Sequence, residues 1–197
     1  MWSEILVLLT TVTVTVYLFL NTDRNFQYVR FFLLAVLLSL VISFIPAIGI
    51  EVPDIIAGEW SRIAGITSLL IVLGMVIREL RPLYARHPAS FSLTPAAIMI
   101  FYPFIADVEV LKDLLNQILQ AGALVITFLL YLSLAARLKF HFVLLTGIGL
   151  FSAAYLLYWF SDVTENLPWM IHLFLSFGLL TVSYSFTDIF QVIRGNG

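Results

Sequence analysis

Seven apolar runs, separated by short polar stretches, follow one another along the chain. Because about 20 apolar residues cross the ~30 Å hydrocarbon layer of a bilayer as a helix, each long run predicts a transmembrane helix. The sequence therefore predicts an all-α, polytopic membrane protein, a bundle of seven transmembrane helices that forms a single domain over residues 1 to 197. The predicted spans are residues 5 to 20, 31 to 48, 63 to 80, 95 to 106, 114 to 136, 142 to 160 and 169 to 190.

The fourth run is the short one. It extends only from Pro95 to Ala106 and contains Pro103, which cannot continue a regular helix. It reaches across a bilayer only if residues 89 to 94 join it.

The basic residues favour seven spans over six. If all seven runs cross and the N-terminus is outside, eight of the ten Lys and Arg residues are cytoplasmic, and only Arg62 and Lys112 are outside. Short connections rich in Lys and Arg stay in the cytoplasm, so this sorting predicts an N-out, C-in orientation. Without the fourth span, Arg137, Lys139 and Arg194 move outside and the sorting is lost. The eight are Arg24, Arg30, Arg78, Arg81, Arg86, Arg137, Lys139 and Arg194.

Composition supports a membrane location. Hydrophobic residues make up 61% of the chain and charged residues 11%, against about 45–50% and about 25% in soluble domains. The start of the chain, Met1 to Glu4, lacks the positive region of a cleaved signal peptide, so the first run is expected to be retained. With short loops and no targeting peptide, we expect an integral protein of the plasma (inner) membrane of a prokaryote.

Little in the sequence points to catalysis. Cysteine is absent, which excludes disulfides and thiolate chemistry, and the three histidines show no metal-binding spacing. A covalently bound retinal is excluded because the two lysines, Lys112 and Lys139, lie at helix ends. The best serine–histidine pair, Ser152 with His172, is expected at two different depths. We therefore expect a protein that is not an enzyme and has no cofactor and no metal.

A polar stripe at the start of the fifth span is the strongest candidate site. Glu109, Asp113, Asn116, Gln117 and Gln120 follow helical spacing on one face, and a polar face inside the outer leaflet is not expected to face lipid. His172 and Ser176 enter the seventh span from the same side, with aromatic residues nearby. The predicted outward-facing ligand pocket is Asn116, Gln117, Gln120, His172, Ser176, Tyr155 and Trp169, with Tyr158 as a further wall. In the alternative interpretation, the fifth span projects beyond the bilayer and its amides only bond to neighbouring helices.

A second candidate site lies on the cytoplasmic side. Arg78 and Arg81 lie one turn apart at the end of the third span, and Arg86 follows in the longest basic connection. These arginines are predicted to contact anionic lipid headgroups or a cytosolic partner. Topology determination alone is the alternative explanation.

Other polar and small residues have structural explanations. Thr10, Thr11, Thr13 and Thr15 in the first span can bond to carbonyls one turn earlier in their own helix. Gly147 and Gly149 predict a close helix contact in the sixth span.

The leading functional hypothesis is a non-enzymatic membrane protein, either a signal-sensing, receptor-like module or an accessory subunit of a membrane complex. Its expected partners are the lipid bilayer and another membrane or cytosolic protein, with a homo-oligomer as a further possibility and no nucleic acid. The alternative is a small facilitator or transporter for an uncharged solute, supported by an arrangement of three spans, one linking span and three spans. A membrane enzyme ranks third.

Overall fold

The computed structural model is all-helical in the residues that it describes. These residues form seven α-helices and three short 3-10 segments, and none of them is in a β-strand. The described residues are 2–21, 27–53, 58, 60–80, 88–104, 108–139, 141–160 and 168–195.

Six of the helices are long and apolar enough to cross a membrane. Each coincides with one of the six long spans predicted from the sequence, and α6 and α8 extend several residues beyond the predicted limits. The six helices are α1 (Trp2–Asn21), α2 (Gln27–Phe44), α3 (Ser61–Leu80), α6 (Glu109–Leu134), α7 (His141–Trp159) and α8 (Pro168–Gly195).

The threonines of α1 bond within their own helix, as predicted. The hydroxyl of Thr11 donates to the carbonyl of Val7 at 2.7 Å, and that of Thr15 donates to the carbonyl of Thr11 at 2.7 Å. Thr10 and Thr13 make the same kind of bond. These bonds satisfy the hydroxyls without a ligand.

The fourth apolar run forms a segmented helix rather than one regular helix. It consists of η4 (Ala89–Leu93), α5 (Ala96–Phe101) and η5 (Tyr102–Phe104), so residues 89 to 93 join the run. Pro95 and Pro103 lack the N–H that a continuous α-helix requires, which explains the breaks. The segment is long for its residue count because a 3-10 helix rises ~2.0 Å per residue, against ~1.5 Å in an α-helix.

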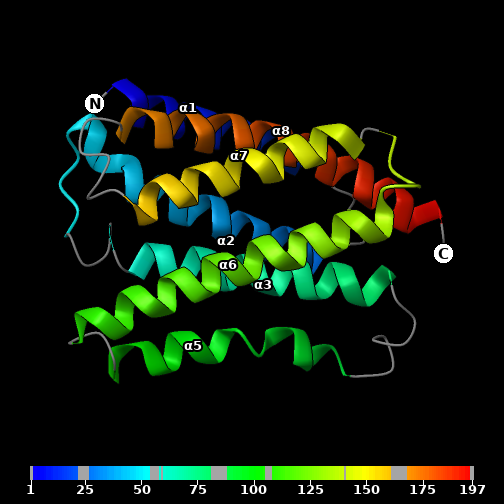
Figure 1. The fold of residues 1–197 in the computed structure, drawn as a ribbon, viewed down its shortest axis with the longest axis horizontal. Helices are drawn as coiled ribbons and strands as arrows, with labels where there is room; N and C mark the ends of the chain where they lie inside the picture. Colours follow the sequence, from blue (N-terminus) through cyan, green and yellow to red (C-terminus); the bar gives the residue numbers. More distant parts are fainter. Residues whose placement is uncertain are drawn as a thin grey trace.

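The six long helices form a closed ring. Neighbours pack in the order α1, α2, α3, α6, α7, α8 and back to α1, while α5 and η4 pack on α3 outside the ring. We call the end of the ring where α1, α3, α6 and α8 begin the N end, and the opposite end the C end (Figure 1). Because α3 ends at the C end and α6 begins at the N end, the η4–α5–η5 segment carries the chain back along the ring.

Two helix pairs of the ring are joined at glycines. A side chain added at Gly65 of α3 would collide with Ser39 of α2, and one at Gly147 of α7 would meet Val182 of α8 at 2.6 Å. These glycines permit close approach of α2 to α3 and of α7 to α8. The predicted contact at Gly147 is therefore confirmed, whereas Gly149 faces open space. The two pairs occupy equivalent places in the halves α1–α2–α3 and α6–α7–α8.

The main apolar core fills the C end of the ring. Val76 of α3, Leu134 of α6, Leu144 of α7 and Ile189 of α8 are each no more than 2% exposed and belong to one cluster. A smaller cluster at the N end joins Tyr102, which is completely buried, to Ile63 and Leu119. This second cluster fixes the segmented helix against α3 and α6.

Candidate functional site

A cavity of about 600 Å³ lies inside the ring and reaches toward its N end. Every helix of the ring contributes to its wall, from Leu18 of α1 to Phe186 of α8. The volume lies within the ~300–1,000 Å³ typical of small-molecule pockets. Most lining residues are aliphatic or aromatic, and polar groups are few. This combination is typical of a site that binds a largely apolar molecule.

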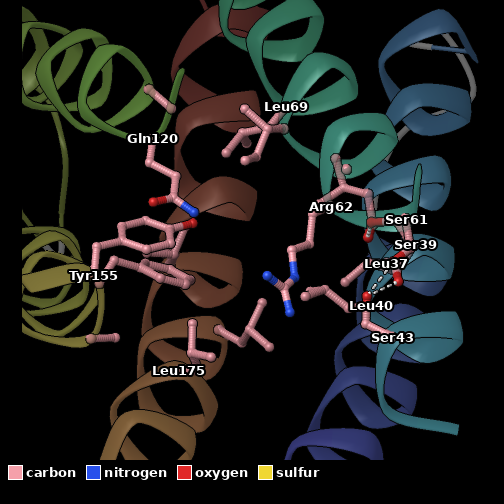
Figure 2. A pocket seen from close by; sticks show the side chains of 18 of the residues that line it. Leu37, Ser39, Leu40, Ser43, Ser61, Arg62, Leu69, Gln120, Tyr155 and Leu175 are labelled. Carbon is pink, nitrogen blue, oxygen red and sulfur yellow. Dashed lines mark hydrogen bonds between the residues drawn. The ribbon is translucent and has the colours of Figure 1, made fainter. Parts of the chain in front are cut away.

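Arg62 projects into the cavity from the first turn of α3 (Figure 2). Its Nη1 donates a hydrogen bond of 2.6 Å to the hydroxyl of Tyr158 on α7, and its guanidinium carbon lies 5.5 Å from the centre of the Tyr158 ring. No Asp, Glu or Lys lines the cavity among the described residues. Among the described lining residues, Arg62 therefore supplies the permanent positive charge, and its guanidinium is bonded to the phenol of Tyr158.

Three serines lie beside Arg62 where α2 meets α3. The hydroxyls of Ser43 and Ser61 are hydrogen-bonded at 2.6 Å, and Ser43 also donates to the carbonyl of Ser39 at 2.9 Å. The hydroxyl of Ser39 donates to the carbonyl of Val36. Figure 2 shows these three serines on the same wall as Arg62. Because the Ser43–Ser61 bond joins α2 to α3, it helps to fix the first turn of α3 and the position from which Arg62 extends.

Gln120 of α6 lies on the opposite wall, next to Tyr155 of α7 (Figure 2). Gln120 is only 5% exposed, and its Oε1 accepts a hydrogen bond of 2.6 Å from Nε1 of Trp159. The amide NH₂ group of Gln120 is thus the part that remains for a ligand. Arg62 and Gln120 therefore present donors to the cavity from two sides.

His172 of α8 completes the polar part of the wall. Its Nδ1 lies 2.9 Å from the hydroxyl oxygen of Ser3, and its ring meets that of Phe44 edge-on at 5.4 Å between centres. The Ser3–His172 hydrogen bond joins α1 to α8. Ser152 donates to the carbonyl of Ile148 in its own helix, and Ser3, although it is bonded to His172, does not line the cavity.

The structure brings together part of the predicted ligand pocket. Gln120, His172 and Tyr155 line the cavity, as does Tyr158, which was expected as a wall. The other four residues do not line it: Asn116, Gln117, Ser176 and Trp169.

Those four residues have different surroundings. Gln117 is exposed, and Trp169 packs against Trp2 with 6.5 Å between ring centres. Oδ1 of Asn116 and Oγ of Ser176 are buried and have no hydrogen-bond partner among the described residues. The polar stripe of α6 therefore turns partly outward, and only its last member reaches the cavity.

The basic candidate site at the C end is described only in part. Arg78 lies in the last turn of α3, half-buried, with Nε lacking a hydrogen-bond partner among the described residues. Arg81 and Arg86 lie outside the described residues. Contact with lipid headgroups or with a partner at these arginines stays a prediction.

Arg62 is the cavity residue that the sequence analysis missed. It was placed on the acidic side of the membrane, as one of two exceptions to the sorting of basic residues. Its departure from the sorting of basic residues was the signal available in the sequence, because Lys and Arg are uncommon in short loops on the outer side of a membrane.

No metal site or relative adds to this description. Among the described residues, no group of three or more His, Asp or Glu side chains is placed to hold a metal ion. Comparisons with protein families, with curated proteins and with solved structures found no match to this chain.

Proposed function

We propose that this protein is a receptor-like sensing module, or a ligand-responsive subunit of a membrane complex, that binds a small molecule in the cavity of the ring. The observation that carries the proposal is a partly open, mostly apolar cavity whose wall includes Arg62, Gln120 and His172. Apolar pockets with a few convergent polar groups are the usual form of small-molecule sites. Among the described residues that line the cavity, no nucleophile is hydrogen-bonded to a base, a pattern that favours binding over chemistry.

The proposal includes seven membrane crossings, with the N end outside. If α3 and α6 both cross in the same direction, the segment between them must return across the bilayer. Residues 89 to 104 extend about 25–28 Å, given the rises of their α and 3-10 parts, close to the ~30 Å of the hydrocarbon layer. Phe101 and Phe104 on this segment are 64% and 81% exposed, as suits a surface in contact with lipid.

The packed C end supports binding over free passage. On the C-end side of the cavity, the ring is filled by Leu134, Leu144 and Ile189. A molecule that enters near Arg62 meets this core instead of a continuous path. A signal would then leave through the helices themselves, above all through α8, which lines the cavity and continues to the C end.

A facilitator is the second candidate, and one observation favours it. The two halves of the ring have the same order and direction, and both line the central cavity. Parallel repeats with a site at their interface occur in transporters. Under this alternative, the packed C end is one of two alternating states.

The test of this proposal blocks the cavity with tryptophan side chains and measures the binding and the transmembrane flux of small amphiphiles. In nanodiscs, we expect small amphiphiles that bind to raise the thermal unfolding midpoint, because a ligand at 100 times its Kd adds about 2.7 kcal/mol. Leu175→Trp and Leu69→Trp place an indole in the cavity and should abolish this rise. Leu156→Trp is the matched control, since Leu156 is 50% exposed and does not line the cavity.

Three outcomes separate the candidates. A rise that disappears in the two cavity variants, without flux into proteoliposomes, supports the receptor-like function. Cavity-dependent flux of the same molecule in the absence of any partner supports the facilitator. A rise that is equal in all three variants would mean that the cavity is not the binding site, and both candidates would then be wrong.

A further inference from the structure

The cavity is polar at one end and apolar at the other. Its N end contains Arg62, Tyr158 and His172, from the adjoining ends of α3, α7 and α8. The far end is lined by Leu18, Leu33, Leu73, Ile148 and Phe186. A molecule that fits both ends needs a polar head and an apolar tail.

The hydroxyls along the deeper wall are already used. Thr127 donates to the carbonyl of Ala123 at 2.7 Å, and Ser183 donates to that of Leu179 at 2.5 Å, each within its own helix. Because their protons are engaged, these side chains offer a ligand little hydrogen bonding. The deep part of the cavity therefore behaves as an apolar space in spite of its two hydroxyls.

Among the residues that the structure describes, no carboxylate lines the cavity beside the charge of Arg62. The guanidinium makes one hydrogen bond, to a neutral phenol, and it forms no ion pair among the described residues. It also belongs to the first turn of a 20-residue helix, where the helix dipole favours negative rather than positive charge. An anion bound beside Arg62 would interact favourably with both the guanidinium and the start of α3.

We propose that the cavity binds an amphiphile with an anionic head and a single apolar chain. The head, a carboxylate or a phosphate monoester, accepts hydrogen bonds from Arg62 and from the amide NH₂ of Gln120. The chain lies along α3 toward Leu73, which is eleven residues or about 16 Å from Arg62 along the helix axis. This inference rests on the proposed function, because it names the ligand class of the same cavity.

Equilibrium binding of radiolabelled dodecanoate to the protein in phosphatidylcholine nanodiscs tests this inference, with empty nanodiscs as the blank. We expect saturable binding, and competition by dodecyl phosphate but not by dodecanol or dodecyltrimethylammonium. Arg62→Gln should weaken binding about 10- to 100-fold, the range expected for a lost charge-assisted hydrogen bond. Arg62→Lys should recover part of the loss.

Arg30→Gln is the matched control. Like Arg62, Arg30 rests on an aromatic ring, with its guanidinium carbon 4.4 Å from the centre of Phe19, but it does not line the cavity. Its substitution should leave dodecanoate binding unchanged. Tyr158→Phe is a second cavity variant that removes only the hydroxyl holding the guanidinium, so it tests the site even if Arg62→Gln does not fold. We expect a several-fold loss of affinity.

The result that would overturn the inference is wild-type affinity in both Arg62→Gln and Tyr158→Phe, or an absence of saturable dodecanoate binding. Competition by dodecanol as strong as that by dodecyl phosphate would also overturn it. If that dodecanol binding were lost in Leu175→Trp, the proposed function would stand with an uncharged ligand. Displacement by dioleoyl phosphatidic acid alone would assign the site to a two-chain bilayer lipid and contradict the single-chain proposal.

Discussion

The two ends of the ring are built from the same six helices but are packed in opposite ways. At the C end, Val76, Leu134, Leu144 and Ile189 leave no more than 2% of their surfaces exposed. From the N end, where Arg62 contributes to its wall, a cavity of about 600 Å³ extends between the same helices as far as Leu18 and Leu33.

The difference indicates that the hollow end is a specific feature of this sequence. Helices in lipid associate through close packing and hydrogen bonds rather than through a hydrophobic force, and the C end shows that these helices can pack closely. At the N end, hydrogen bonds between helices replace apolar contacts at the cavity wall, as between Ser43 and Ser61 or between Trp159 and Gln120. These bonds keep the helices in place around a space.

The largest expected effect concerns the sides of the membrane on which the two ends lie. The chain has no cysteine, so Glu51→Cys, beyond α2 at the N end, and Gln191→Cys, in the last turns of α8, each provide one thiol. In intact cells, a membrane-impermeant maleimide should label the first variant and not the second. Labelling of both after the cells are permeabilised is the control. Labelling of both in intact cells would contradict the odd number of crossings.

An intermediate effect is expected when the same truncation is made at each end. Leu134→Ala at the packed C end leaves a new cavity and should destabilise the protein by about 2–5 kcal/mol. Leu175→Ala borders existing space, so it loses contacts on one side only and should cost much less. Unfolding in sodium dodecyl sulfate measures both. Equal losses of unfolding free energy in the two variants would mean that the space beside Leu175 is not empty in the protein.

The smallest effect is expected from a single hydrogen bond at the cavity wall. Trp159→Phe retains an aromatic ring but removes the N–H that binds Oε1 of Gln120, and a loss of about 0.6–2 kcal/mol is expected. Trp169→Phe is the control, because this tryptophan is 41% exposed and packs on Trp2. The same unfolding assay compares the two variants. An equal loss in both would indicate that Gln120 is held in place by other contacts.

The sequence predicted the long helices well because membrane spans are encoded by length and apolarity, which need no knowledge of the neighbours. All six appeared where they were expected. The fourth run was harder to define, because Pro95 and Pro103 divide it into pieces that do not share one periodicity. The orientation remains a prediction from the basic residues.

The candidate site was predicted less completely, because helix rotation is not encoded by polarity alone. Spacing placed Asn116, Gln117 and Gln120 on one stripe, but the packing of α6 against α3 and α7 turns only Gln120 into the cavity. Gln117 remains exposed. Arg62 was missed because its role depends on Tyr158, 96 residues away, and no local pattern connects the two.

The segment of residues 89 to 104 contributes little to the buried core, but it determines the direction in which the following helices run. No residue of α5 is fully buried, and the completely buried Tyr102 holds the run in place together with the partly buried Ile98 and Met99. By returning the chain to the N end, it gives the helices of α1–α2–α3 and α6–α7–α8 the same directions along the ring. With a connection that did not return, the second triplet would be inverted, and Gln120 and Tyr158 could not lie level with Arg62. The irregular connector therefore sets the direction of the second helix triplet, and the cavity wall depends on that direction.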